Sequence, residues 1–218
     1  MTTRRDFLVG AAGVGLTSLA ASAAAQQPDD RPRRGLPAEI IDKEAWPVRK
    51  PLVVSTWRFG LPANDAAWPV LAAGGRALDA AETGVRVVEA DPDIMSVGYG
   101  GRPDRDGHVT LDSCVMDEHG NAGSVAFLEG FMHPVSVARR VMEKTPHVML
   151  VGAGARQFAL AEGFTEQDLL TDKARAEWQE WLKKGEYHPW TAPAKVSPTN
   201  HDTISMLALD AAGDLAGV

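Results

Sequence analysis

The chain has 218 residues, of which 44% are apolar and 23% are charged, an ordinary composition for a globular protein. Its formal net charge of −7 at pH 7 argues against nucleic acid or an anionic membrane surface as a binding partner. The sequence also lacks any run of aromatic residues interleaved with Lys or Arg, so nothing in it points to either class of partner.

Residues 1–25 have the features of a twin-arginine export signal. Arg4 and Arg5 precede an apolar stretch over 9–19, and Ala23–Ala25 suit a small-residue cleavage site. The alternative is a transmembrane anchor, but the apolar stretch is shorter than the ~20 residues that a membrane-spanning helix needs. We therefore expect a periplasmic or secreted protein that is exported in a folded state and has no stable membrane anchor.

The next segment, residues 26–50, is polar and rich in Pro and Arg, which is typical of a flexible linker. From residue 51 onward, strand-like and helix-like patterns alternate. The patterns predict a strand over 51–57, a helix capped by Asn64 and reaching about Ala73, and an amphipathic helix over 77–89 with Ala81, Val85 and Val88 on one face.

A glycine-rich loop over 96–107 opens the middle of the chain. Two β-rich runs, 109–116 and 122–128, flank Asp117–Asn121, which is a typical hairpin turn. Further elements are expected as helices over 135–144, about 155–162 and 171–184, and as a strand over 147–151. This mixture of helices and hairpins indicates an α/β or α+β fold.

Two local patterns near the last of these helices carry their own expectations. Thr165–Asp168 resembles a capping box, which would mark the start of a helix. Trp178, Trp181 and Leu182 form an apolar stripe at helical spacing. We expect this stripe to belong to the core rather than to a cofactor site.

Several patterns resemble cofactor or metal sites, but each lacks residues that such a site needs. Gly152–Gly154 follows a predicted strand, but Gln157 stands where a dinucleotide fingerprint needs its third glycine. Asp104–Gly107 is better explained as a solvated turn than as a calcium loop, because other ligand positions are unfilled. Cys114 is the only cysteine, so no intrachain disulfide can form, and we expect it to be a small core residue. The six histidines lack metal-ligand spacing, so no cofactor and no metal are expected.

The most informative stretch is the junction at Asp202 and Thr203. A proline-containing loop leads into Ile204–Leu209, an apolar run expected to be a buried strand. A threonine hydroxyl needs a base to become a nucleophile, and the threonine's own α-amino group can serve if the chain is cut before it. That amine has an unperturbed pKa near ~8, so part of it is free base at neutral pH.

Asp202 is placed to help such a cut. Its carboxylate can take the proton of the Thr203 hydroxyl while that oxygen attacks the preceding carbonyl. Taken alone, however, the tripeptide His201–Thr203 is better explained as an ordinary loop-to-strand boundary.

Four longer stretches change that interpretation. They are VSTWRFGL over 54–61, SVGYGGRPDRDG over 96–107, VMEKTPHVMLVG over 141–152 and NHDTI over 200–204. In this order they resemble the glycosylasparaginases, the N-terminal-nucleophile hydrolases that split an asparagine-linked sugar from its amide. The resemblance runs from about Pro51 to the last residue.

The resemblance implies a four-layer αββα sandwich, in which two antiparallel sheets lie between layers of helices. It implies that Thr203 is the catalytic nucleophile and that His201, Asp202 and Thr203 take part in self-processing. Trp57 would lie beside the nucleophile and shape the substrate pocket, although a core tryptophan at a strand end stays an alternative. Ser96 is expected near the nucleophile too.

The resemblance also divides the chain at the nucleophile. Residues 51–202 correspond to the α-subunit part of the fold, and 203–218 to the start of the β-subunit. The family's β-subunit is much longer and supplies the Arg and Asp that hold the substrate, a further Thr and the oxyanion stabiliser. We therefore expect a C-terminally truncated chain that is inactive without the missing β-subunit segment. The resemblance further implies a dimer or heterotetramer of processed chains.

The resulting hypothesis is hydrolysis of the side-chain amide of N-glycosylated asparagine, the aspartylglucosamine type of substrate, after autocleavage between Asp202 and Thr203. An L-asparaginase or isoaspartyl peptidase on the same scaffold is the first alternative, and the His-Asp-Thr-Ile stretch favours the sugar-amide branch over it. The alternative from another class is an inactive exported α/β binding protein. Ser205 stands where the family usually has glycine, and crowding there could slow processing.

Overall fold

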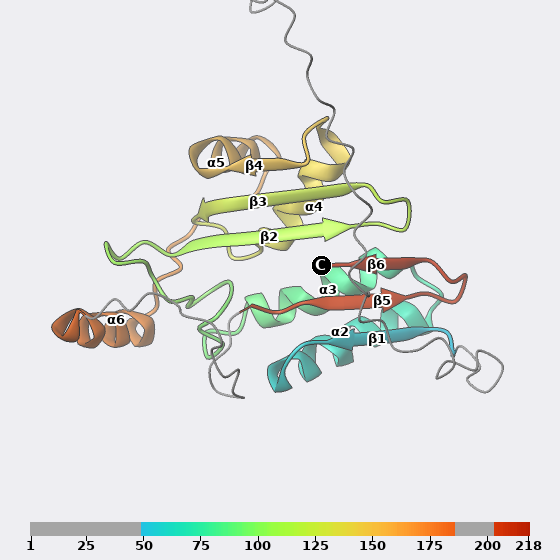
Figure 1. Ribbon diagram of the computed structural model, residues 1–218, viewed down its shortest axis with the longest axis horizontal. Helices are drawn as coiled ribbons and strands as arrows, with labels where there is room; N and C mark the ends of the chain where they lie inside the picture. The colour runs from blue at the N-terminus through green and yellow to red at the C-terminus, as the bar shows by residue number, and fades with distance from the viewer. Residues whose placement is uncertain (1–48, 186–202) are drawn as a thin grey trace, which may run out of the picture. The chain divides into compact units, whose positions relative to one another are not determined.

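The computed structural model describes residues 49–185 and 203–218 (Figure 1). The predicted export signal, most of the predicted linker, His201 and Asp202 lie outside these ranges. The described strands are β1 (Leu52–Ser55), β2 (Thr110–Met116), β3 (Ala122–Glu129), β4 (Met149–Val151), β5 (Met206–Leu209) and β6 (Leu215–Gly217). The described helices are the short 3₁₀ turn η2 (Arg58–Gly60), α2 (Leu61–Ala72), α3 (Ala77–Glu89), α4 (Pro134–Lys144), α5 (Gly152–Ala161) and α6 (Asp172–Lys184).

The six strands form one sheet in the order β1-β5-β6-β2-β3-β4 (Figure 1). The strands β1 and β5 pair antiparallel from Leu52 opposite Leu209 to Ser55 opposite Met206. The predicted hairpin between β2 and β3 is confirmed, and β4 pairs with β3 in parallel. Between β6 and β2 the ladder consists of the pair Gly217 and Met116. The two halves of the sheet are therefore joined at one end and leave space at the other.

The turn between β5 and β6 is organised by the buried carboxylate of Asp210. Its Oδ1 accepts hydrogen bonds from the backbone N–H groups of Gly213 and Asp214, both at 3.0 Å, and its Oδ2 accepts one from Ala77 at 3.3 Å. Burial alone would raise the pKa of Asp210, but these N–H donors outweigh it and lower the pKa below its usual value. The side chain thus ties the β5–β6 hairpin to the first turn of α3.

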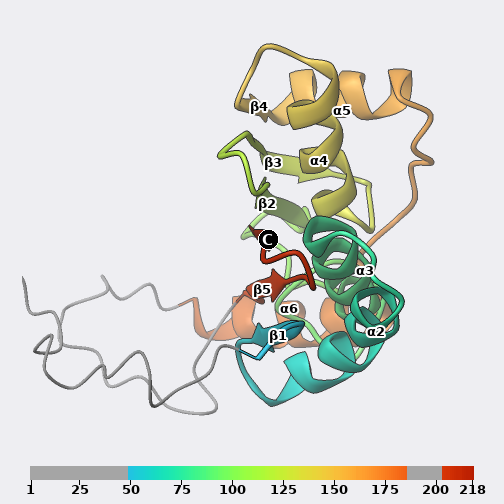
Figure 2. The same cartoon turned by 90° about the vertical axis from the view of Figure 1, so that its right-hand side faces the viewer.

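Helices α2 to α5 cover one face of the sheet (Figure 2). The amphipathic pattern of α3 explains its place, because Ala81, Val85 and Val88 are all buried, as predicted. The core between helices and sheet includes Leu78, Val125 and other side chains of α3, α4 and the central strands. None of the described helices has the length and apolar character needed to cross a membrane.

The opposite face of the sheet carries large apolar side chains that are about half exposed. We call it the open sheet face; it consists of Leu52, Val54, Met116, Met149, Val151, Leu207 and Leu215, with exposed fractions of 48–54%. Residues paired across adjacent strands point to the same side, and the register places all seven on this face. For this reason β5 alternates between buried and more exposed residues. Its apolar composition had suggested a strand that is buried throughout.

The mixed α/β class is confirmed. The described residues supply one sheet and one layer of helices. The open sheet face is the surface on which the second sheet of a four-layer sandwich would pack, and that further pair of layers stays a prediction.

Two predicted helix starts are wrong. Helix α2 begins at Leu61 rather than at a cap on Asn64, because Pro62 suits the first turn, where its missing N–H loses no hydrogen bond. The capping box predicted at Thr165–Asp168 does not begin a helix. Instead, Thr171 caps α6 by accepting a hydrogen bond from the backbone N–H of Ala174 at 3.3 Å.

Two predictions of core residues, one for the stripe on α6 and one for Cys114, are also wrong. On α6, Trp181 and Leu182 are 36% and 40% exposed, and the indole N–H of Trp178 donates to the carbonyl of Arg105. The helix packs on the loop around Arg105 rather than on the sheet, so its stripe covers a loop. Cys114 is exposed because its position in β2 points to the open face of the sheet.

Candidate active site

Thr203 lies just ahead of β5, in a backbone conformation that is unusual for a β-branched residue. Its φ is +74°, in the left-handed region that costs such a residue of the order of 1–3 kcal/mol. The main-chain carbonyl of Thr203 accepts a hydrogen bond from Nε1 of Trp57 at 3.0 Å. Trp57 itself has a φ of +63°. The surrounding structure thus holds both residues in strained conformations and in contact with each other.

The residues next to Trp57 and Thr203 extend this contact. The backbone N–H of Thr56 donates to the carbonyl of Ser205, and the N–H of Ser205 donates to the hydroxyl oxygen of Thr56, both at 3.0 Å. The hydroxyl of Ser205 donates to the carbonyl of Val218 at 3.1 Å. The backbone that follows Thr203 is therefore fixed by Thr56, the residue directly after β1, and the Ser205 side chain is accommodated with a hydrogen bond.

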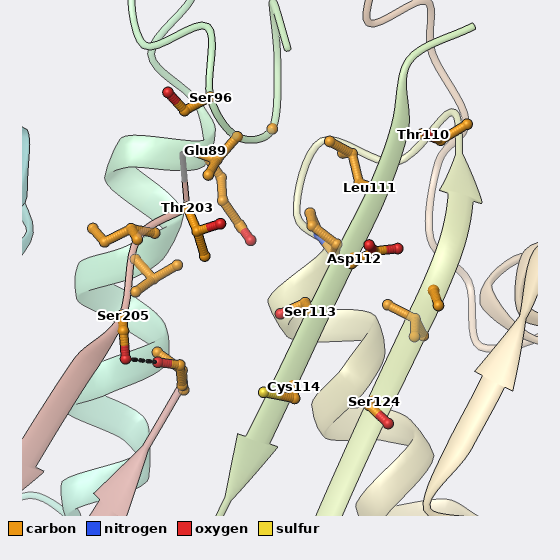
Figure 3. Close-up of a pocket in the computed structure, with 18 of the residues that line it drawn as sticks. Glu89, Ser96, Thr110, Leu111, Asp112, Ser113, Cys114, Ser124, Thr203 and Ser205 are labelled. Atoms are coloured by element: carbon orange, nitrogen blue, oxygen red, sulfur yellow. Dashed lines mark hydrogen bonds between the residues drawn. The ribbon is translucent and has the colours of Figure 1, made fainter. Parts of the chain in front are cut away.

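The side chain of Thr203 borders a cavity of about 580 Å³ between β5 and β2 (Figure 3). Ser96, from the loop after α3, borders the same cavity, as do Glu89 and Asp112. Other bordering residues are Val85, Val97, Gly98, Thr110, Leu111, Ser113, Cys114, Ser124, Val125, Ala126, Pro134, Met149, Ile204, Ser205 and Val218. Thr203 and Ser96, two predicted site residues that are far apart in the sequence, thus border one cavity. Trp57 contacts Thr203 by donating its indole N–H to the main-chain carbonyl of Thr203.

The glycine-rich loop reaches the cavity because Gly98 lies directly on the end of α3. Gly98 has a φ of +58°, and a Cβ at this position would lie 2.0 Å from the carbonyl oxygen of Glu89. The same oxygen accepts a hydrogen bond from the N–H of Tyr99 at 2.7 Å. Only glycine combines this conformation with so close an approach, so Gly98 sets where Ser96 lies.

Asp112 is a cavity residue that sequence reasoning missed. The β2–β3 register shifts between Leu111 and Ser113, and Asp112 Oδ1 accepts a hydrogen bond from the N–H of Phe127 at 2.8 Å. Phe127 has a φ of +52° at this irregularity. An acidic residue within an alternating strand was the only available signal, and it does not reveal a bulge.

Glu89 is the second residue that was missed, although a signal existed. It lies one helical turn after Val85, on the buried face of α3, where an acid is unusual. Burial raises the pKa of Glu89, against the effect of His133 and the backbone N–H of Val135, which lower it.

The described residues include no group of three or more His, Cys, Asp or Glu side chains arranged to hold a metal ion.

Comparison with known proteins gives one consistent family. The sequence profile of a family described as asparaginase matches residues 54–218. An N(4)-(beta-N-acetylglucosaminyl)-L-asparaginase of Elizabethkingia miricola is 62% identical over 170 residues, which cover 78% of this chain and 48% of that protein. The rat protein of the same name is 37% identical over 192 residues, 76% of this chain and 55% of that protein.

A plant-type L-asparaginase of Pyrococcus abyssi is 39% identical over 160 residues, 70% of this chain and 52% of that protein. The chain therefore spans about half the length of the curated relatives that it matches.

Proposed function

The chain belongs to the asparaginase family, and from this premise we propose that the protein hydrolyses the side-chain amide of N-glycosylated asparagine, with Thr203 as its nucleophile. The observation that carries the proposal is the position of Thr203 at the cavity, held by Trp57 in a strained conformation. The 62% identity to an N(4)-(beta-N-acetylglucosaminyl)-L-asparaginase supports the sugar-linked substrate.

The proposed first step is a self-cut between Asp202 and Thr203. The Thr203 hydroxyl attacks the carbonyl carbon of Asp202 while its proton passes to a base, for which the Asp202 carboxylate is our candidate. The peptide C–N bond breaks, an ester forms, and the Thr203 nitrogen takes up the proton as a free amine. Water then hydrolyses the ester. The positive φ of Thr203 supports this step, because the cut releases the backbone from that strain.

The proposed catalytic cycle uses the new N-terminus. The α-amine of Thr203 accepts the hydroxyl proton as the oxygen attacks the substrate's side-chain carbonyl. The amide C–N bond breaks, the proton passes to the leaving glycosylamine, and an aspartyl ester of Thr203 remains. Water attacks this ester and releases aspartate, which restores the hydroxyl. Ser96 and Trp57 are proposed to shape the pocket and position the nucleophile, and no cofactor is needed for this chemistry.

Release of aspartate and glycosylamine from an N-glycosyl-asparagine tests the proposal. We expect turnover to coincide with a new N-terminus at Thr203, detected by N-terminal sequencing. L-asparagine and an isoaspartyl dipeptide should be assayed in parallel at equal concentration. A protein that is never cut at Thr203 and releases no aspartate from any of the three would support the inactive binding protein instead.

The second candidate function is that of an L-asparaginase or isoaspartyl peptidase. The 39% identity to a plant-type L-asparaginase favours it, although that likeness is more distant than the 62% identity to the sugar-amide hydrolase. Faster turnover of asparagine or of the isoaspartyl dipeptide than of the glycosylated substrate would select this candidate.

Trp57→Phe is expected to slow the self-cut roughly two- to tenfold. Phenylalanine keeps the apolar ring but removes the N–H that donates to the Thr203 carbonyl, and a neutral hydrogen bond contributes about 0.5–1.5 kcal/mol. The rate is measured by intact-mass analysis of freshly made protein over time. Trp68→Phe, on the exposed side of α2, is the matched control and should cut at the normal rate. Equal rates for both variants would contradict a role for the Trp57 N–H.

Further proposals concern assembly and location. We propose that processed chains work as a dimer or heterotetramer, and that residues 1–25 direct the protein through the twin-arginine pathway to the periplasm or the medium. The oligomeric state is measured by light scattering of the processed protein.

Replacing Arg4 and Arg5 together by Lys is expected to retain the protein in the cytoplasm. The export receptor reads the paired guanidinium groups, and lysine keeps only their charge. Fractionation of cells followed by immunoblotting gives the measurement. The control is the double change Arg33→Lys and Arg34→Lys, which alters a basic pair outside the signal. Normal export of the Arg4 and Arg5 variant would rule out this route.

A further inference from the structure

The hydrogen bonds between Thr56 and Ser205 depart from a regular antiparallel ladder at one atom. These residues are the next pair in register after Ser55 and Met206, and the Thr56 N–H donates to the Ser205 carbonyl at 3.0 Å. In a regular pair the second bond would run from the Ser205 N–H to the main-chain carbonyl of Thr56. Here the Ser205 N–H donates to the Thr56 hydroxyl oxygen, also at 3.0 Å. A side chain therefore takes the place of the main chain as acceptor.

This exchange occurs where the chain turns at Trp57. Trp57 has a φ of +63° and precedes the 3₁₀ turn η2, so the strand direction ends directly after Thr56. The Trp57 indole N–H donates to the Thr203 carbonyl at 3.0 Å. Two consecutive residues thus hold the segment that begins at Thr203 at two points, its first carbonyl and the amide groups of Ser205. We call these three hydrogen bonds the 56–57 clamp.

Both points are needed to keep the backbone of Thr203 in its strained conformation. A hydrogen bond to the Thr203 carbonyl fixes one atom of the peptide group, which can still pivot about that oxygen. Holding Ser205, two residues later, removes this freedom and maintains the φ of +74° at Thr203. This angle sets where the preceding carbonyl lies relative to the Thr203 hydroxyl, and attack requires the two reacting atoms to be about 3–3.5 Å apart.

We propose that Thr56 is a positioning residue for the self-cut, and that its hydroxyl and the indole N–H of Trp57 act as one unit. This inference rests on the proposed function, because it concerns the cut before Thr203. Thr56 is exposed, so its side chain is not needed to fill the core. A side chain of the same shape without the oxygen would keep the fold and lose the second point of the 56–57 clamp.

Thr56→Val tests the role of the hydroxyl, because valine keeps the shape of threonine and removes the acceptor. We expect the self-cut to slow roughly two- to tenfold, the effect of losing one neutral hydrogen bond that holds the reacting geometry. Thr56→Ser keeps the hydroxyl and should cut at close to the parent rate. Intact-mass analysis of freshly made protein over time gives each rate.

Thr145→Val is the matched control. The Thr145 hydroxyl also accepts a backbone N–H, from His147 at 3.0 Å, but Thr145 follows α4 and does not border the cavity. This variant should cut at the parent rate. A parent rate for Thr56→Val, or equal slowing by Thr145→Val, overturns the inference. So does a urea midpoint that, in a Thr203→Ala background, falls much further for Thr56→Val than for Thr145→Val, because a general loss of structure would then explain the slower cut.

The double variant Thr56→Val with Trp57→Phe tests whether the two side chains act as one unit. If they hold a single strained span, loss of either one releases it, and the double variant should be no slower than the slower single variant. Independent contributions would multiply instead, and rates that multiply overturn the shared role. A parent protein that is not cut at Thr203 overturns the proposed function and the inference with it. A parent that is cut, with Thr56→Val cut equally fast, overturns the inference alone.

Discussion

Thr203→Ala is expected to stay a single uncut chain and to lack amidase activity. Alanine has no hydroxyl to attack the carbonyl of Asp202, so the ester cannot form and the N-terminal amine is never released. Loss of a nucleophile that acts together with its base lowers turnover by roughly 10⁴- to 10⁶-fold. Intact-mass analysis reports the cut, and aspartate release from an N-glycosyl-asparagine reports the activity.

Thr203→Ser and Thr203→Cys are the informative companions. Both keep a nucleophilic atom on Cβ, so both should still be cut, with serine also free of the β-branched strain at this positive φ. Cleavage of the alanine variant at the same bond would show that another protein makes the cut and would refute self-processing.

Gly98→Ala is expected to reduce the free energy of unfolding by roughly 2–5 kcal/mol, because strain at positive φ adds to overpacking against the backbone. The added Cβ would lie 2.0 Å from the carbonyl oxygen of Glu89, and main chain at the end of α3 has little freedom to move away. The loop that carries Ser96 should shift and the self-cut should slow. Urea unfolding of the variant, in a Thr203→Ala background that prevents cutting, gives the stability.

Gly74→Ala separates the strain of a positive φ from the overpacking against the backbone. Gly74 has a φ of +77°, but a Cβ there would meet no atom within 4 Å. Its replacement should therefore cost only the conformational strain, about 1–2 kcal/mol. Equal losses for the two variants would show that the close approach of Gly98 to Glu89 contributes nothing.

The sequence predicted best those elements whose pattern is periodic and local. The amphipathic helix expected over 77–89 is α3 (Ala77–Glu89), and the β2–β3 hairpin forms where its turn residues indicated. Prediction failed where tertiary packing decides. Nothing local shows that α6 packs on a loop, so its tryptophans were assigned to the core.

The candidate site shows the same division. The resemblance to a known family brought Trp57, Ser96 and Thr203 together, and no local pattern could have done so. Glu89 and Asp112 were missed because their place at the cavity follows from helix docking and from a register shift between strands. Both depend on neighbours that are distant in sequence.

The pairing of β1 with β5 has a consequence for how the protein can be assembled. These strands are paired from Leu52 opposite Leu209 to Ser55 opposite Met206, and a cut before Thr203 would leave them on separate polypeptides. In the uncut chain the two strands find each other by an intramolecular reaction. After the cut, recovery from denaturant becomes a bimolecular reaction whose rate depends on protein concentration. The uncut chain would therefore fold readily. After the cut, the two separated polypeptides would regain the native structure only slowly in dilute solution.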